Sequence, residues 1–312
     1  MESLLLQAFV FVASIFILVR SSDYFIINAE KIGLALRWPH FLTGVLIVAI
    51  GTSLPELATS IASITEGETD MLLGNVLGSN VANIFLGLGL VFFLANKTVS
   101  FKHNIFDVHF PVLIMATTLA VFTALDGQIT QLESLFFHGV LFSYLWFLFS
   151  DSKPSHNPLE KHPPFRWVYV AGCVLGLLGL IVSSKFAVGS VIFIAEAMGL
   201  AKTALAATLV AIGTSLPEMM VVYSSLKRKN VELVIGNIIG SNIFNILLIV
   251  GIGSSLTTLE VSDLTLTVIL PFAIGATLIY WMISIDKRIT KQEGLAMTFL
   301  YVLFVGKLFG WF

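Results

Sequence analysis

The nonapeptide VAIGTSLPE occurs twice in this chain, at residues 48–56 and again at residues 210–218. Each copy lies within a long apolar stretch and ends in a carboxylate. Proline has no N–H to donate and clashes with the carbonyl four residues earlier, so we expect each copy to interrupt its helix. Free carbonyls and carboxylates are costly in hydrocarbon and persist where they line a cavity or find a partner. The two copies therefore predict a polar site inside an apolar protein.

The composition predicts an integral membrane protein. Of the 312 residues, 57% are hydrophobic and only 12% are charged, whereas soluble domains are about 25% charged. A bilayer core takes about 20 apolar residues as helix, and that length gives about ten spans, too uniformly apolar for barrel strands. We interpret the first span as retained in the protein rather than as a cleaved signal peptide. The expected spans are 3–20 (extending to about 30), 40–64, 71–95, 105–124, 132–149, 166–186 (extending to about 197), 203–226, 231–255, 264–284 and 292–310.

The distribution of Lys and Arg predicts the orientation in the membrane. Loops that follow odd-numbered spans hold thirteen of these residues, whereas the remaining loops and the C-terminal tail hold two. Basic residues favour the cytoplasmic side, so we expect both termini outside and the polar linker at 150–166 in the cytoplasm. The net charge of −2 and the single Cys173 give no sign of a nucleic-acid partner or of an internal disulfide.

The repeat extends beyond the nonapeptide. The shift that places Val48 on Val210 also places GNVLGSNVANI (74–84) on GNIIGSNIFNI (236–246). Each half holds five predicted spans, and an odd number means that the second half enters the membrane in the opposite sense. The fold class expected is therefore an all-α multi-pass membrane protein of two inverted five-helix repeats, residues 1–150 and 166–312, joined by a linker at 151–165. This architecture is typical of secondary transporters with sites near the membrane midplane.

The motifs together offer a set of oxygen donors. The two glutamates supply charge, and the prolines should free backbone carbonyls near Ala49–Gly51 and Ala211–Gly213. Each Ser–Asn pair shares a helix face. With no Cys or His in the motifs, zinc, copper and nickel are disfavoured, while six to eight oxygens and two charges suit Ca²⁺ and could also hold Na⁺. The candidate ligands are Glu56, Glu218, Thr52, Ser53, Thr214, Ser215, Asn83, Asn245, Ser79, Ser241, Ala49 and Ala211.

Other motif residues have a simpler explanation. Glycines at positions 74, 78, 236 and 240 recur four residues apart, a spacing that lets helices approach closely. The amides of Asn80 and Asn242 can join helices to one another without touching an ion. We therefore leave these residues out of the expected site.

The paired motifs resemble the alpha-repeats of the calcium/cation antiporter superfamily, in its prokaryotic sodium/calcium exchanger branch. GTSLPE followed in the next span by GNxxGSNxxNI, twice, is a specific signature, and the ten-span plan extends the resemblance to nearly the whole chain. The resemblance implies Na⁺/Ca²⁺ exchange by alternating access, with Glu56 and Glu218 as central Ca²⁺ ligands. It also implies that the Thr, Ser and Asn residues and the carbonyls of Ala49 and Ala211 complete the Na⁺ and Ca²⁺ positions.

Two departures bear on the coupling ion. Potassium-dependent members of the superfamily usually carry Asp where this chain has Asn245, and vacuolar proton-coupled members use a GNxxE motif instead. Both departures favour sodium coupling without potassium. Ca²⁺ neutralises two carboxylates, and three Na⁺ ions leave one net positive charge, so such a cycle would be electrogenic. The long first spans of the two halves, 3–30 and 166–197, are expected to slide as the gate.

Three other functions are weighed against this one. A channel would need a continuous pore, and an intramembrane hydrolase using Ser53 or Ser215 would need a base, but no His lies in a motif. The stronger alternative is a Ca²⁺/H⁺ or other cation/proton antiporter on the same fold, with protons on the two glutamates in place of Na⁺. We expect no enzyme activity, no cofactor, no regulatory calcium-binding domain, a monomer, and a prokaryotic inner membrane as the location.

Overall fold

The protein is almost entirely helical. The computed structural model describes residues 2–94, 98–102, 104–150, 163–197 and 202–311, without the side chains of 2–3, 92, 195–196 and 202–214. Four two-residue strands join the loops. Three segments, named η, are π-helical turns within longer helices. The helices are α1 (Glu2–Ala35), α2 (His40–Thr43), η1 (Gly44–Ala49), α3 (Ile50–Thr52), α4 (Leu54–Glu66), α5 (Asp70–Leu94), α6 (His109–Ala124), α7 (Ser134–Ser150), α8 (Trp167–Ala197), α9 (Lys202–Lys227), α10 (Val231–Phe244), η2 (Asn245–Val250), α11 (Gly251–Leu256), η3 (Thr265–Ile269), α12 (Leu270–Ile283) and α13 (Lys291–Leu308).

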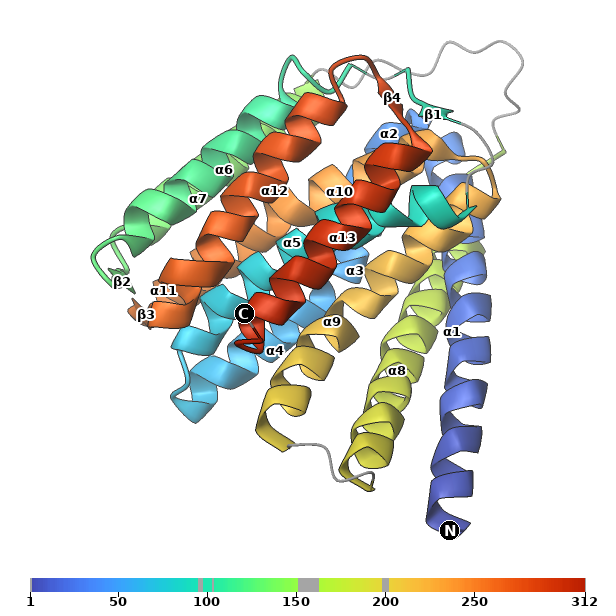
Figure 1. Ribbon diagram of the computed structural model, residues 1–312. Coiled ribbons are helices and arrows are strands. Elements are labelled where there is room, and N and C mark those ends of the chain that lie inside the picture. The colour runs from blue at the N-terminus through green and yellow to red at the C-terminus, as the bar shows by residue number, and fades with distance from the viewer. Residues whose placement is uncertain (1, 95–97, 103, 151–162, 198–201, 312) are drawn as a thin grey trace.

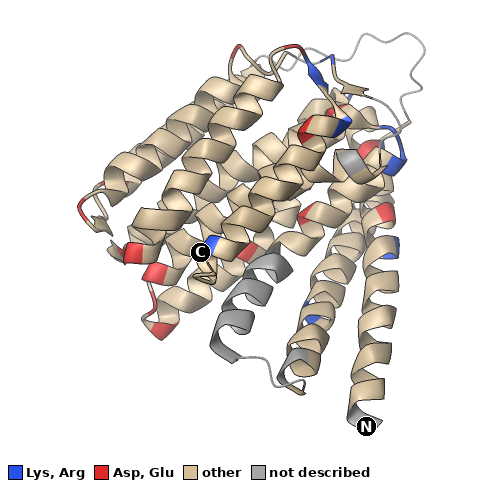
Figure 2. Cartoon of the chain, in the orientation of Figure 1, with Lys and Arg blue, Asp and Glu red and all other residues tan. Residues whose placement is uncertain are grey.

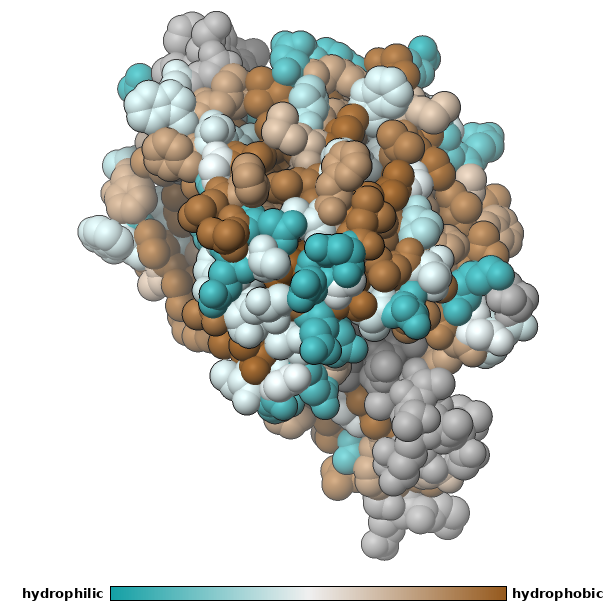
Figure 3. Space-filling view, turned by 90° about the vertical axis from the view of Figure 1, so that its left-hand side faces the viewer, coloured by the Kyte–Doolittle hydropathy of each residue, from teal (hydrophilic) through white to brown (hydrophobic). Residues whose placement is uncertain are grey.

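Within the described residues, six helices are long and apolar enough to cross a membrane. The other predicted spans lie on α6 and α7, which are apolar but shorter, and on α9 and α13. The protein is therefore an integral membrane protein, and its apolar side chains form a band between hydrophilic ends in Figure 3. The six helices are Leu4–Ala35, His40–Glu66, Asp70–Val91, Trp167–Ile194, Val231–Leu256 and Thr265–Ile283.

Two strand pairs tie the first half of the chain to the second. Strand β1 (Val99–Ser100) pairs antiparallel with β4 (Arg288–Ile289), and β2 (Gln128–Ile129) pairs antiparallel with β3 (Leu259–Glu260). The same difference in residue number separates β1 from β3 and β2 from β4. The two strand pairs are therefore equivalent to each other under the repeat. The two pairs lie at opposite ends of the helices (Figure 1).

A repeated helix cap follows the same shift. Thr130 and Glu133 close a capping box before α7, where the Thr130 backbone N–H donates to Glu133 Oε2 at 2.7 Å. Thr290 and Glu293 form the same box before α13, again with a 2.7 Å bond from the backbone N–H. This reciprocal arrangement satisfies two N–H groups that a helix start leaves unpaired. The difference in residue number between the two caps is slightly smaller than the difference between the two motifs. The second half therefore has slightly fewer residues between its motifs and its cap.

The first helix of each half packs against the other along most of its length. Helices α1 and α8 lie side by side at the edge of the molecule (Figure 1). Gly176 makes the close approach possible, because a Cβ there would stand 2.7 Å from the backbone nitrogen of Phe25. The side chains of Leu5, Phe9 and Phe16 on α1 are exposed, as expected of a surface that faces lipid.

The centre of the molecule is built around α5 and α10. In the span Val231–Leu256, 94% of the most apolar 18-residue stretch is buried, and the α10 glycines Gly236 and Gly240 face α2 and η1. A Cβ on Gly236 would stand 2.3 Å from the Phe41 carbonyl oxygen, and one on Gly240 would stand 2.8 Å from the Ala49 Cβ. The packing interpretation of these two glycines is therefore confirmed.

Charge is distributed unequally between the two ends. Most Lys and Arg gather at the end that carries β1 and β4, whereas Asp and Glu occur at both ends and are largely without basic neighbours near β2 and β3 (Figure 2). A patch of hydrophilic side chains also lies toward the β2–β3 end in Figure 3. The basic end thus collects the loops that the sequence places in the cytoplasm.

Candidate functional site

The first nonapeptide interrupts its helix as expected. Helix α3 ends at Thr52, Ser53 adopts φ −81° and ψ −1°, and α4 begins at Leu54 with Pro55 in its first turn. Proline is favoured at that position because its missing N–H has no partner to lose there. The break places Glu56 in the first turn of α4, directly after the interruption.

The second nonapeptide does not interrupt its helix. Helix α9 runs from Lys202 to Lys227 with Pro217 inside it, so the prediction of a break here is wrong. An interior proline removes one helical hydrogen bond, and a membrane helix can continue where its surroundings satisfy the freed group. The interruption expected in the third span is likewise absent from α5, whereas α10 gives way to the π-helical turn η2 at Asn245.

The two motif glutamates are brought together in the interior. Glu56 and Glu218 are fully buried, and no described residue makes a hydrogen bond to any of their four carboxyl oxygens. No Lys or Arg of the described side chains pairs with either of them. The two carboxyls are close enough for their charges to repel each other, with the Ser79 hydroxyl beside Glu56 and the Thr52 hydroxyl beside Glu218.

Further polar groups that could ligate a cation are buried without hydrogen-bond partners among the described residues. They are the hydroxyls of Ser53, Ser79, Ser215 and Ser241, the whole amide of Asn83 and Oδ1 of Asn245. Leaving a buried polar group without a hydrogen bond costs about 1–3 kcal/mol. Unpaired buried oxygens in the same motifs as two unpaired carboxyls are expected where a hard cation supplies the missing interactions.

Three predicted ligands need separate comment. The Ala49 carbonyl accepts a hydrogen bond from the Ser53 backbone N–H at 3.0 Å, so Pro55 does not free it as expected. The helix bond lost to a proline at position 55 is that of residue 51, two positions further along. Ala211 and Thr214 lie on α9, but their side chains fall outside the described part of the chain.

The structure adds contacts that the sequence did not predict. The Asn80 side chain donates from Nδ2 to the Asn242 carbonyl at 3.0 Å, and its Oδ1 accepts from Asn245 Nδ2 at 3.0 Å. Asn80 therefore does join helices, as expected, but it also holds a candidate ligand. The signal that could have revealed this was the repeat itself, since Asn80 and Asn242 are equivalent residues.

Comparison with known proteins bears on this geometry. The family model described as "Sodium/calcium exchanger protein" matches residues 6–150 and again residues 168–310. The chain belongs to the sodium/calcium exchanger family. CaxA of Alkalimonas amylolytica, named as an antiporter, is 33% identical over 94% of this chain and 99% of its own length. The sodium/calcium exchanger MaX1 of Methanosarcina acetivorans is 29% identical over 94% of this chain and 95% of its own.

Solved structures of an exchanger share the whole fold. The sodium-calcium exchanger NCX_Mj, soaked with Na⁺ and Sr²⁺, superposes with a TM-score of 0.81 and 26% identity over 96% of this chain and 98% of its own. The same exchanger without Na⁺ and Ca²⁺ gives a TM-score of 0.83 and 26% identity over 98% and 99% of the two chains. The likeness of this family member to NCX_Mj thus extends through both halves.

Proposed function

We propose that the protein is a secondary-active antiporter that exchanges Na⁺ for Ca²⁺ by alternating access. The observation that carries the proposal is the pair Glu56 and Glu218, fully buried, within range of each other's charge and without a hydrogen-bond or ion-pair partner among the described residues. Two such carboxylates repel until a cation binds between them. The names of MaX1 and NCX_Mj support Na⁺ and Ca²⁺ as the exchanged ions.

The proposed site uses the chemistry of hard cations. Ca²⁺ takes six to eight oxygen ligands, and its two charges balance the two carboxylates. Ser53, Ser79 and Asn83 offer unpaired oxygens from the first half, and Ser215, Ser241 and Asn245 offer them from the second. Thr52, Thr214 and the carbonyls of Ala49 and Ala211 complete the proposed set. Three Na⁺ ions would leave one net positive charge, so the cycle is electrogenic, and the neutral Asn245 supports independence from K⁺.

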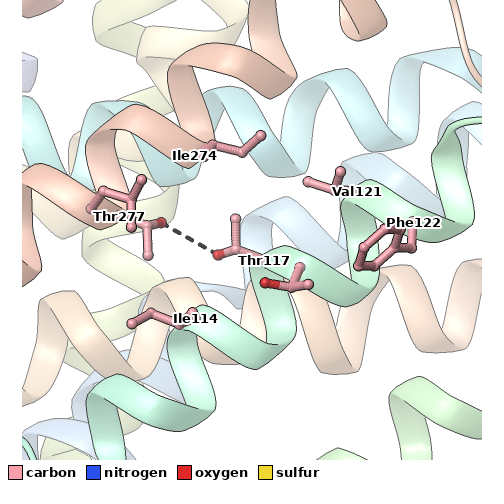
Figure 4. Close-up of a pocket in the computed structure, with 8 residues that line it drawn as sticks. Ile114, Thr117, Val121, Phe122, Ile274 and Thr277 are labelled. Carbon is pink, nitrogen blue, oxygen red and sulfur yellow. Dashed lines mark hydrogen bonds between the residues drawn. The ribbon is translucent and has the colours of Figure 1, made fainter.

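We also propose that ten helical segments span the membrane as two inverted repeats. Support comes from bonds between repeat-equivalent residues, which lie on a twofold axis: Asn80 with Asn242, and Thr117 with Thr277 at 3.3 Å. Figure 4 shows the latter pair where α6 meets α12, beside a shallow apolar pocket. Because the operation exchanges two strand pairs at opposite ends, its axis lies across the helices rather than along them.

The orientation proposed from the sequence agrees with the distribution of charge. The basic β1–β4 end faces the cytoplasm of a prokaryotic cell together with the linker, and both termini face outside. The linker at 150–166 is too short for a regulatory calcium-binding domain. We propose that the protein acts as a monomer in the inner membrane.

Alternating access is proposed to come from sliding of α1 and α8 as one unit. Their close mutual packing at Gly176 and Phe25 suits a rigid pair, and α1 is largely exposed toward lipid. The pair also contacts α9 near the site, because the Ser22 hydroxyl donates to the Met220 carbonyl at 2.8 Å, two residues beyond Glu218. A shift of α1 along its axis would therefore change contacts beside one of the two carboxylates.

Transport into vesicles tests the proposal. Proteoliposomes loaded with Na⁺ should take up ⁴⁵Ca²⁺ when diluted into Na⁺-free medium, and a K⁺-specific ionophore that sets the membrane potential should change the rate. Vesicles without Na⁺ but with an imposed pH gradient are the matched control. Uptake that follows the pH gradient and ignores Na⁺ would replace the proposal by a cation/proton antiporter on the same site.

A further inference from the structure

Asn80 and Asn242 meet where the two repeats meet. They are equivalent residues under the shift that relates the motifs, and both side chains are almost fully buried. Asn80 donates to the backbone carbonyl of Asn242 and accepts from Asn245 on the other half. Within the Asn245 amide, Oδ1 is then the atom left without a partner among the described residues, and that oxygen belongs to the candidate site.

The reciprocal bonds are not made. Asn242 Nδ2 donates to the Ile238 carbonyl of its own helix at 2.6 Å, and Asn242 Oδ1 has no partner among the described residues. Asn83, the repeat equivalent of Asn245, also has neither amide atom paired within the described residues. Thus Asn80 orients the site amide of the second half, while Asn242 leaves the site amide of the first half unoriented.

The backbone shows the same asymmetry. Asn245 begins the π-helical turn η2, whereas Asn83 lies inside the uninterrupted helix α5. Conversely, residues 44–49 form the π-helical turn η1, whereas the equivalent stretch 206–211 belongs to the continuous helix α9. Wide turns of this kind are common at functional sites. Two halves that share their motifs therefore hold different conformations around the same candidate site.

We propose that Asn80 and Asn242 are positioning residues that exchange roles when the transporter changes the side it faces. In the state described, Asn80 orients Asn245; in the opposite-facing state, Asn242 turns from Ile238 to the Asn80 carbonyl and orients Asn83. The inference rests on the proposed function, because alternating access in an inverted repeat exchanges the conformations of the halves. Each state then makes the same number of hydrogen bonds through these two asparagines. The pair therefore does not favour one state over the other in free energy.

The pair predicts opposite effects from equivalent substitutions. Asn80→Leu removes two bonds made only in the described state and should lower its population relative to the other state by about fivefold. Asn242→Leu removes the bonds of the opposite-facing state and should raise the described population by a similar factor. Thr117→Val is the matched control, because a bond between equivalent threonines is the same in both states.

Pulsed electron–electron distance measurements on the full chain, free of Na⁺ and Ca²⁺, provide the readout. Spin labels are attached to cysteines introduced at the exposed positions Leu5 and Leu132, after Cys173→Ser removes the native thiol. The distance between the labels reports movement of α1 relative to the loop before α7. Shifts of opposite sign for the two asparagine variants, with none for Thr117→Val, are expected. Shifts of the same sign, or one unchanged distance in every variant, would overturn the proposal.

Two provisions keep the result interpretable. Asn80→Ala and Asn242→Ala serve if a leucine variant fails to elute as a single species on size exclusion. The distances are measured without ions, so opposite shifts remain meaningful even if vesicle uptake shows proton rather than Na⁺ coupling. A protein that exchanges Na⁺ for Ca²⁺ normally but shows shifts of one sign would retain the proposed function and lose the role exchange.

Discussion

The Arg228 guanidinium lies 3.0 Å from the Glu30 carboxylate and joins the end of α1 to the turn that follows α9. Glu30 accepts a second bond, at 2.6 Å, from Asn230 Nδ2, which also lies 3.2 Å from His40 Nδ1. Asn230 in turn caps α10 by accepting from the Leu233 backbone N–H. One carboxylate therefore holds the proposed moving helix to two elements of the opposite half.

Glu30→Gln should destabilise the protein more than Arg228→Gln. The arginine is partly exposed, so its ion pair contributes no more than about 1 kcal/mol, whereas changing Glu30 also weakens the bond to Asn230. Thermal unfolding in detergent measures the difference. Arg288→Gln, which breaks the exposed Arg288–Asp286 pair, is the control and should leave the midpoint unchanged; equal effects of all three changes would contradict the expected order.

Glu56→Gln and Glu218→Gln should each reduce Na⁺-dependent Ca²⁺ uptake to background while expression stays near normal. Each change removes one of the two charges that balance Ca²⁺, and it also relieves repulsion between buried carboxylates. Uptake of ⁴⁵Ca²⁺ into Na⁺-loaded vesicles is the measurement. Glu66→Gln, an exposed acid at the end of the same helix α4, should transport normally. Full transport by either buried variant would remove that glutamate from the site.

Asn245→Asp should change ion dependence or affinity without unfolding the protein. The added charge attracts a divalent ion, but an ionised carboxylate cannot donate to Asn80 as the amide does at 3.0 Å. Asn83→Asp adds the same charge to an amide that has no such bond to lose. Calorimetric titration with Ca²⁺ compares the two, and the first variant is expected to gain less affinity than the second. The reverse order would show that the Asn80–Asn245 bond does not support the site.

Gly236→Ala should lower the free energy of unfolding by about 1–3 kcal/mol through overpacking. Its Cβ would stand 2.3 Å from the Phe41 carbonyl oxygen, a backbone atom that cannot move alone. Gly275→Ala, in α12 with no atom within 4 Å of the added Cβ, should be neutral or slightly stabilising. Chemical unfolding followed by tryptophan fluorescence checks both. A neutral Gly236 variant would mean that α10 and α2 can separate without loss.

Much of the fold was predictable because its causes are local or periodic. Apolar length marked the helices, and the constant shift between the motifs identified Glu56 and Glu218 as equivalent residues, which the fold brings within range of each other's charge. The capping boxes at Thr130 and Thr290 carry a sequence signature as well, although their relation to the repeat becomes evident only through the strand pairs. These features depend on residue type and spacing, which a single sequence displays in full.

The differences between the halves could not be predicted from the sequence. VAIGTSLPE is identical in both, yet one copy breaks its helix at Ser53 and the other continues through Pro217. The nonapeptide alone predicts the same local structure in both copies, so the difference arises from the sequence and the contacts around each copy. The one-way bonding of Asn80 likewise depends on contacts between the halves.

Each strand pair takes one strand from each half, and this has a consequence for biosynthesis. While the ribosome is still making the second half, β1 and β2 have no partners, since β3 and β4 come from the last part of the chain. Neither end of the molecule can close until its strand from the second half has been made. We therefore expect the β2–β3 end to close once β3 has been made, and the β1–β4 end to close only after α12 has followed.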